Sequence, residues 1–310
     1  MHRGRVRTLS GIGALFSICA GACAGVTPQA APTGRDAAVG FDALVVHDAL
    51  GGVDLSVTGG AEHPPPAPGK VYAHSATTLY LLEPISKQVT VVGDFDCGGS
   101  MVDLAVDKAG RMTGSAAISI NGALGGQLVS IDPTTAHCQA LTQSANLITS
   151  LTYVPAGTLL PNAEALVGYD ADQYLQVDPT TGALTQVGVL NDAASGGTHW
   201  VSSGDIVSIT GGGTYLTVLP QSGPIAGGDR IVEVDPKTGA LTRVIGPTGK
   251  DAVLGLGYWG GVAYGFTQAG ELIQIDLGTG AGTTIPIPNA ASDLSFLGAG
   301  TTTIAPIVLD

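Results

Sequence analysis

The most regular pattern in this chain is a short run of alternating apolar and polar residues, followed by a polar turn and a second β-rich run. The first run is clearest in Leu175-Gln176-Val177, Val232-Glu233-Val234 and Ile273-Gln274-Ile275. Alternation with a period of two is typical of a strand that has one buried face. Leu241-Thr242-Arg243-Val244-Ile245 is an example of the second run. Each copy is therefore predicted to form a β-hairpin.

The turn between the two runs occurs twice almost unchanged, as Asp178-Pro179-Thr180-Thr181-Gly182 and Asp235-Pro236-Lys237-Thr238-Gly239. The Asp side chain can accept a hydrogen bond from the backbone two residues on, Pro presets φ, and Gly at the fifth position supplies a left-handed residue. Weaker copies begin at Glu83, Asp132 and Asp276. The fifth residue of the first two copies is Lys87 and Ala136 instead of Gly, which predicts altered turns there.

The spacing of the copies predicts the architecture. They start at residues 83, 132, 178, 235 and 276, so a unit recurs every 41 to 57 residues. A second strand-turn-strand element lies between successive hairpins, and four strands per unit are typical of a propeller blade. These elements include Met101–Val106 before Arg111–Gly114, Ile148–Val154, His199–Ser202 before Asp205–Ile209, and Leu254–Trp259 before Val262–Phe266.

The two ends of the repeat region complement each other. Ser292–Leu297 resembles Val102–Val106, the first strand of a unit, but no hairpin follows it. The first hairpin conversely lacks a complete pair of strands before it. We therefore expect an all-β propeller of four-stranded antiparallel blades, closed by pairing of N- and C-terminal strands. Five blades are expected, and six remain an alternative because Thr301–Val308 could add a strand.

The N-terminal residues have the composition of an export signal. Arg3, Arg5 and Arg7 precede a short apolar run, and residues 1–22 end in small side chains, as a cleaved signal peptide does. Two processing sites compete. Ala20-Gly21-Ala22 is a signal-peptidase site, and the same residues before Cys23 resemble a bacterial lipobox, in which the Cys becomes lipidated.

Residues 23–69 are rich in Pro, Asp and Ala, and we expect them to be a disordered tether before a propeller domain at 70–310. The domain contains two cysteines, Cys97 and Cys138. Outside the cytoplasm they could form a disulfide, or they could remain two thiols, and the sequence leaves both possibilities open.

The charge of the chain limits its partners. The net charge is −13 at pH 7, and nucleic-acid binding requires a basic surface. We therefore expect no nucleic-acid partner, and membrane contact only through the N-terminal lipid.

Candidate chemistry is sparse. Asp103 and Asp293 occupy matching places on predicted first strands, which would line the central channel side by side, and two carboxylates could hold Ca²⁺. Each could instead hydrogen-bond the backbone. His199 and Trp200, at a strand start, could contact a ligand at the channel mouth or simply pack. No catalytic motif with the required spacing is present, so we assign no catalytic residue, and the identity of any metal is open.

The repeats, of the kind Val-Asp-Pro-x-Thr-Gly at Val177–Gly182, resemble bacterial exported propeller repeats of the PQQ-like and YVTN-like type. Quinoprotein dehydrogenases of similar appearance carry a Trp in most blades. This chain has only Trp200 and Trp259, so the resemblance does not imply a quinone cofactor.

The sequence thus favours a cell-envelope binding or scaffolding module over an enzyme. We expect an outer-membrane lipoprotein, or otherwise a secreted or periplasmic protein, that binds a protein or carbohydrate at the cell surface. The site is expected in loops at one face, notably Leu159–Ala165 and Pro220–Asp229, where the repeat spacing is longest. The alternative is an exported lactonase-like or glycosidase-like hydrolase that uses channel carboxylates, with or without Ca²⁺.

Overall fold

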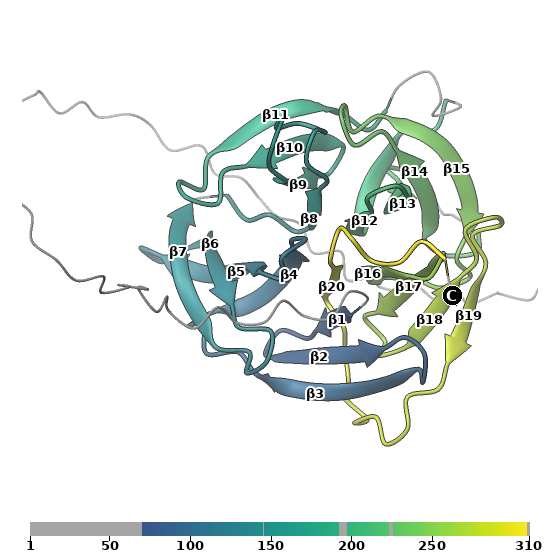
Figure 1. The fold of residues 1–310 in the computed structure, drawn as a ribbon, viewed down its shortest axis with the longest axis horizontal. Helices are drawn as coiled ribbons and strands as arrows, with labels where there is room; N and C mark the ends of the chain where they lie inside the picture. Colours follow the sequence, from purple (N-terminus) through teal and green to yellow (C-terminus); the bar gives the residue numbers. More distant parts are fainter. Residues whose placement is uncertain (1–69, 145, 192–196, 223–225, 309–310) are drawn as a thin grey trace, which may run out of the picture. The chain divides into compact units, whose positions relative to one another are not determined.

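The computed structural model describes residues 70–308, apart from residues 145, 192–196 and 223–225. Twenty strands form five four-stranded antiparallel sheets, which are arranged as blades around a central axis (Figure 1). The predicted all-β propeller with five blades is confirmed. The expected signal peptide, tether and Cys23 lie outside the described residues. Within the described part of the chain, no helix is long and apolar enough to cross a lipid bilayer.

Each blade has its innermost strand at the axis and three further strands stacked outward. Blade one contains β20 (Gly298–Thr301), β1 (Val71–His74), β2 (Thr78–Glu83) and β3 (Gln88–Asp94). Blade two contains β4 (Ser100–Val106), β5 (Met112–Ile120), β6 (Ala123–Ile131) and β7 (Cys138–Ser144). Blade three contains β8 (Leu151–Val154), β9 (Ala165–Asp170), β10 (Gln173–Val177) and β11 (Leu184–Val189). Blade four contains β12 (Trp200–Ser208), β13 (Thr214–Pro220), β14 (Arg230–Val234) and β15 (Leu241–Pro247). Blade five contains β16 (Val253–Trp259), β17 (Val262–Thr267), β18 (Leu272–Ile275) and β19 (Gly282–Ile285).

The ring closes in blade one, where the last strand pairs with the first. β20 runs antiparallel to β1, with Val71 opposite Thr301 and His74 opposite Gly298. The predicted closure by N- and C-terminal strands is confirmed, but the closing strand is Gly298–Thr301 and not Ser292–Leu297. Its small residues are required by the space: a Cβ on Gly298 would overlap His74 and Asp103, and one on Gly300 would overlap Leu104.

Blade four also differs from the prediction. Trp200–Ser208 is one continuous innermost strand whose register with β13 shifts between Ser202 and Ile206. The sequence Asp205–Ile209, predicted as a second strand, therefore belongs mainly to the first, and Thr214–Pro220 is the second. The extra residues of this β-bulge interrupt the alternation, which explains the misassignment.

The five repeated turns share one conformation. The fifth residue has a positive φ in every copy, at 59° for Lys87, 65° for Ala136, 70° for Gly182, 69° for Gly239 and 84° for Gly280. Its N–H donates to the carbonyl of the first residue in each case, at 2.7–2.9 Å. The prediction of altered turns at Lys87 and Ala136 is therefore wrong. At Lys87, the side chain contacts the Tyr264 hydroxyl and lies 4.5 Å from the centre of its ring, and these contacts help to offset the strained backbone.

The hydrophobic core lies between the blades. Leu216, Val218 and Val232 of blade four pack against Tyr169 and Tyr174 of blade three, for example. Such packing of sheet against sheet joins neighbouring blades into the ring that Figure 1 shows.

The ring has two faces. We call the end where the innermost strands begin the entry face, and the end where they finish the exit face. The C-terminal segment Thr302–Val308 leaves β20 at the exit face and crosses in front of the axis in Figure 1. Its backbone bonds blades four and five, since Thr210 N–H donates to Thr303 O (2.7 Å) and Gly260 N–H to Pro306 O (2.7 Å).

Candidate functional site

Two aspartates meet on the propeller axis. Asp103 lies on β4 and Asp205 on β12, and both side chains are fully buried. Each sits at a shift in the register between its innermost strand and the next strand, where a β-bulge turns the side chain away from regular alternation. The two carboxyls lie close together, because both meet neighbouring residues of β20: a Cβ on Gly298 would overlap Asp103 Oδ1, and the N–H of Ala299 donates to Asp205 Oδ2.

The same two side chains accept backbone N–H groups from all five innermost strands. Asp103 accepts Leu104 N–H of β4 (2.8 Å) and Leu151 N–H of β8 (2.5 Å). Asp205 accepts hydrogen bonds from Ile206 of β12 (2.6 Å), Leu256 of β16 (2.8 Å) and Ala299 of β20 (3.3 Å). Two residues thus connect every blade at the axis. We call Asp103, Asp205 and these five N–H donors the axial clasp.

The two buried carboxyls of the axial clasp must hold a proton between them. Burial raises the pKa of both carboxyls well above their usual range, and the charge of Asp103 raises the pKa of Asp205 further. Two buried carboxyls this close to each other repel strongly if both are ionised. The pair therefore carries one proton at pH values where an exposed Asp is ionised.

His74 of β1 faces the pair from the closing blade. Its Nε2 lies 3.8 Å from Asp103 Oδ1, and its Nδ1 donates to the Ser75 carbonyl at 2.8 Å. Since a carbonyl can only accept, the neutral ring carries its proton on Nδ1. Burial lowers the pKa of His74 to about 4, so the imidazole is neutral above that pH.

The clasp uses equivalent positions in the five blades. The residue just before the donating N–H is Asp103, Ser150, Asp205, Gly255 or Gly298. Two blades supply the carboxyls, and the glycines leave room for them: a Cβ on Gly298 would overlap Asp103, and one on Gly255 would approach the Gly298 backbone.

The structure separates the predicted pair of Asp103 and Asp293. Asp293 lies exposed in a turn before β20, and its predicted place on the axis belongs to Gly298. The true partner, Asp205, was missed because Asp205–Ile209 was assigned to a second strand. The similarity of Asp103-Leu104-Ala105-Val106 to Asp205-Ile206-Val207-Ser208 was the signal that could have found it.

His199 and Trp200 lie apart from the clasp, at the entry face. The His199 side chain is about half exposed (48%), and its Nε2 lies 3.1 Å from Asp172 Oδ2. Trp200 is buried between blades three and four. The amide of Asn191 fixes it by accepting Trp200 N–H (2.7 Å) and donating to its carbonyl (2.9 Å). His199 is therefore accessible to a ligand, whereas Trp200 packs in the core.

Cys97 and Cys138 form a disulfide between blades one and two, with Cα atoms 5.0 Å apart. Cys97 lies in the loop that enters β4, and Cys138 begins β7 just after the second repeated turn. Asp96, beside Cys97, accepts Cys138 N–H (2.7 Å) and pairs with His137 Nδ1 (2.6 Å). This side of the ring rim is thus fastened covalently and by polar contacts.

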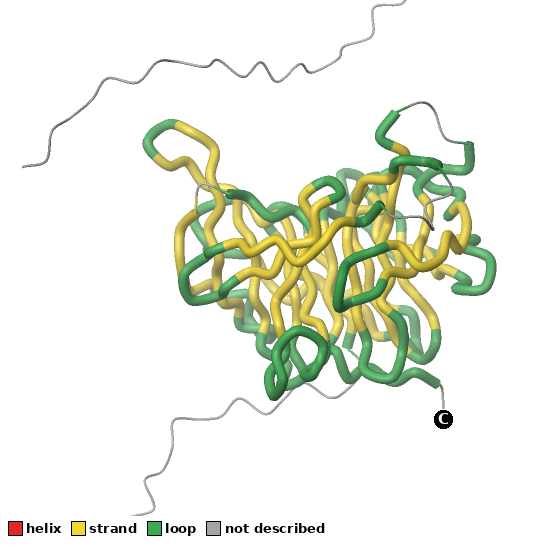
Figure 2. Tube along the Cα trace, turned by 90° about the horizontal axis from the view of Figure 1, so that it is seen from above, coloured by secondary structure: helices red, strands yellow, loops and turns green. Residues whose placement is uncertain are grey.

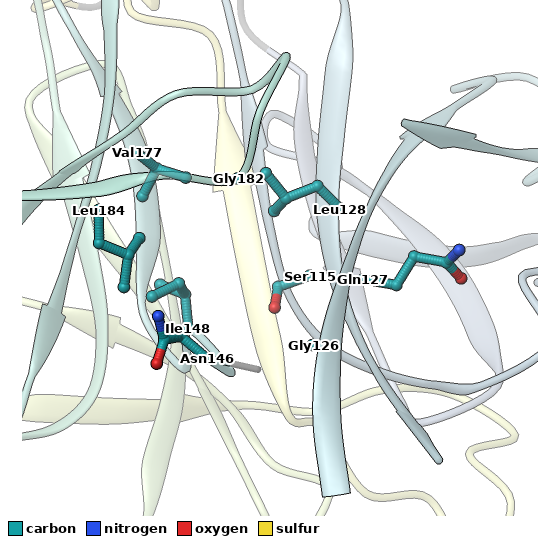
Figure 3. Close-up of a pocket in the computed structure, with 9 residues that line it drawn as sticks. All are labelled: Ser115, Gly126, Gln127, Leu128, Asn146, Ile148, Val177, Gly182 and Leu184. Carbon is teal, nitrogen blue, oxygen red and sulfur yellow. The ribbon is translucent and has the colours of Figure 1, made fainter. Parts of the chain in front are cut away.

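A pocket lies between blades two and three (Figure 3). It is small and partly open to solvent. Leu184 and Ile148 line one side of it, and Leu128 and Ser115 the other. None of its nine lining residues titrates near neutral pH, so it lacks the groups needed for acid-base chemistry.

Within the described part of the chain, no group of three or more His, Cys, Asp or Glu side chains is arranged to hold a metal ion. Separation of Asp293 from Asp103 removes the pair of ligands that the sequence suggested for Ca²⁺. The oxygens of Asp103 and Asp205 face backbone N–H groups, which occupy the directions a cation would need.

No protein-family model matches the chain, and no curated protein has a matching sequence. Several solved structures are similar in fold. They include a candidate 6-phosphogluconolactonase of Bacteroides fragilis NCTC 9343, with 11% identity and a TM-score of 0.43, over 76% of this chain and 98% of that one. BamB of Moraxella catarrhalis has 13% identity and a TM-score of 0.33, over 70% of each chain. An oligogalacturonate lyase in complex with manganese has 10% identity and a TM-score of 0.37, over 70% of this chain and 61% of that one. Similarities at this level carry no argument about activity or ligand.

Proposed function

We propose that this protein is an exported binding module, anchored to the cell envelope by a lipid on Cys23, that engages a protein or carbohydrate through the entry face of the ring. The observation that carries this proposal is the axial clasp. Its two carboxyls are fully buried and already accept five backbone N–H groups, so they serve the frame. Binding then falls to the exposed loops that the frame holds in place.

Two features favour the entry face over the exit face. The C-terminal segment crosses the exit face and occupies backbone groups of blades four and five there. The entry face instead presents His199 beside Asp172, and a hairpin of β5 and β6 that projects from the ring, at the upper left of Figure 2. The tip of that hairpin carries Leu124, which is 67% exposed.

The structure changes which loops we propose. Leu159–Ala165 connects β8 to β9 at the exit face, whereas Pro220–Asp229 connects β13 to β14 at the entry face. The expectation that both belong to one face is therefore wrong. Glu164 also accepts Lys108 N–H at 2.8 Å and contacts the Thr303 hydroxyl, which fastens the first loop to the ring and to the C-terminal segment.

Photo-crosslinking in cells tests the binding face. A photoreactive residue would replace His199 at the entry face or, as the matched control, the exposed Asn162 in the β8–β9 loop at the exit face. We expect a discrete crosslinked partner from position 199 and none from position 162. Crosslinks from position 162 alone, or from neither position, would contradict the proposal.

Export and anchoring are tested separately. We expect mass spectrometry of the mature N-terminus to show an acylated Cys23, and Cys23→Ala to release the protein from the membrane fraction. An unmodified N-terminus at Cys23 or Gly25 would contradict the anchor and leave a freely secreted protein.

The hydrolase alternative has its own test. Such an enzyme would need substrate to reach the carboxyls, which are closed off by the five strands that bond them. We expect no turnover of lactone or glycoside substrates with calcium supplied. Turnover that is abolished in Asp103→Asn would overturn the binding-module proposal.

A further inference from the structure

We infer that the propeller ring is closed by a single proton shared between Asp103 and Asp205, and that rising pH releases its closing strand β20. The axis is the only place in the described ring where one pair of side chains bonds the innermost strand of every blade. Loss of the shared proton would put two negative charges in contact at this point, without solvent to screen them.

β20 is the weakest member of the clasp. Its bond from Ala299 N–H to Asp205 is 3.3 Å, against 2.5–2.8 Å for the other four. It is also a strand of only four residues, built from Gly298, Ala299, Gly300 and Thr301. Small side chains contribute little apolar burial, so hydrogen bonds to β1, to the clasp and from Tyr258 N–H to Thr301 Oγ1 (3.1 Å) hold this strand.

Few other titratable groups face the pair. From β1 it is faced by His74, and β8, β16 and β20 contribute backbone N–H groups. The remaining titratable side chains of these strands lie elsewhere. The Tyr153 hydroxyl bonds Thr113, Tyr258 stacks on Tyr215, and Tyr72 lies near Asp132.

The direction of the pH effect follows from proton linkage. Because the folded pair keeps a proton that unfolded Asp loses near pH 4, stability falls as pH rises from there through the folded pKa. His74 acts oppositely, since its pKa falls from 6.5 to about 4 on folding and stability rises with pH between these values. Between about pH 4 and 6.5 the stability lost at the aspartate pair and the stability gained at His74 cancel. Above pH 6.5 only the loss of stability at the aspartate pair remains.

Urea unfolding of the mature protein between pH 5 and 9 tests the inference. We expect a folding equilibrium constant that is nearly flat to about pH 6.5 and then falls roughly tenfold per pH unit until the pair ionises. Hydrogen exchange should show loss of protection at Ala299 before the amides of β5 or β17. A constant that stays flat or rises from pH 6.5 to 8 would overturn the inference.

Three Asp→Asn variants test whether the fall of the folding constant above pH 6.5 comes from the aspartate pair. Asp103→Asn can donate its amide to Asp205 without a proton, so its folding constant should no longer fall above pH 6.5. Asp229, whose pKa burial also raises, is separated by Asp229→Asn, which should retain most of the fall. Exposed Asp293→Asn should behave as the native protein. An unchanged fall in Asp103→Asn would contradict the inference.

A spectroscopic measurement keeps the inference testable if Asp103→Asn does not fold. Infrared spectra of the native protein at pH 7 should show the carbonyl band of a protonated carboxylic acid, which disappears as pH is raised in step with exchange at Ala299. Absence of this band at pH 7 would overturn the inference.

Discussion

The aspartates of the axis and those of the repeated turns make the same kind of hydrogen bond with opposite consequences. Asp178 in a turn accepts Thr180 N–H (2.7 Å) and Thr181 N–H (3.1 Å), and these bonds lower its pKa. Asp103 and Asp205 also accept backbone N–H groups, yet burial raises their pKa. Water around the turn solvates the carboxylate, whereas the axis excludes it. Solvent access, and not the hydrogen-bond pattern, therefore decides whether the carboxyl group of an Asp in this protein is ionised or holds a proton.

The largest expected effect comes from removing a carboxyl of the clasp. Asp205→Ala would deprive three buried N–H groups on three blades of their acceptor, and should lower the free energy of unfolding by about 3–5 kcal/mol. Denaturant unfolding measures this loss. Asp293→Ala, at an exposed turn, is the control and should change little. Equal stability of the two variants would show that the axis does not hold the ring.

The disulfide at the rim should come next. Replacing both Cys97 and Cys138 by Ala removes a link across 41 residues of sequence, at an expected cost of about 2–4 kcal/mol. Unfolding with and without reductant checks this value. The native protein should lose stability in reductant, and the double variant should not respond. A reductant response in the double variant would assign the effect to something other than this bond.

A methyl group added beside the clasp should have an intermediate effect. Gly298→Ala would place a Cβ against His74 and Asp103, and we expect a loss of about 1–3 kcal/mol by overpacking. Gly278→Ala is the matched control, because its added Cβ meets only the end of the Asp276 side chain at 3.1 Å. If both variants melted at the same temperature, space at the axis would not be limiting.

Removal of a turn carboxylate should matter less than any change at the axis. Asp178→Ala frees two exposed N–H groups that water can bind, so we expect only a small drop in melting temperature at pH 7. Because the pKa of Asp178 is lowered on folding, its contribution is present above about pH 4 and is lost as pH falls below that value. Melting curves of native and variant protein should therefore converge in acid. Divergence in acid would contradict the assigned role.

The smallest net effect is expected at Lys87. Lys87→Gly relieves a positive φ, a gain of about 1 kcal/mol, but loses the contacts of the ammonium group with Tyr264. The two effects should nearly cancel. Lys87→Ala loses the contacts and keeps the strain, so it should be the less stable variant of the two. The reverse order would show that the backbone at Lys87 is not strained.

Sequence pattern was sufficient for the outer strands and insufficient for the axis. Hairpins such as Val232–Val234 with Leu241–Ile245 alternate regularly because one face of each strand is buried. The innermost strands do not alternate, since both of their faces are covered. β20 has almost no hydrophobic signal, because Gly298 and Gly300 are required by lack of space.

The irregular pattern of the innermost strands also explains why only one of the two carboxyls of the axial clasp could be predicted. Asp103 was found because Met101–Val106 has a recognisable strand pattern. The bulge in β12 hides Asp205, and the resemblance of Ser292–Leu297 to Val102–Val106 points to Asp293, whereas the fold places Gly298 at the axis. Contacts between residues far apart in sequence, such as Asp205 with Ala299, come from ring closure and leave no local trace.

Closure of the ring by β20 has a consequence for how the protein is made. The strand that pairs with β1 and donates to Asp205 follows all the other described strands along the chain. A growing chain therefore cannot bury its axis until Gly298–Thr301 has been synthesised, and a product that ends before Gly298 keeps an open seam. Pairing of β20 with β1 thus acts as a check that all five blades are present, since only a chain that includes β20 can fold to the closed state.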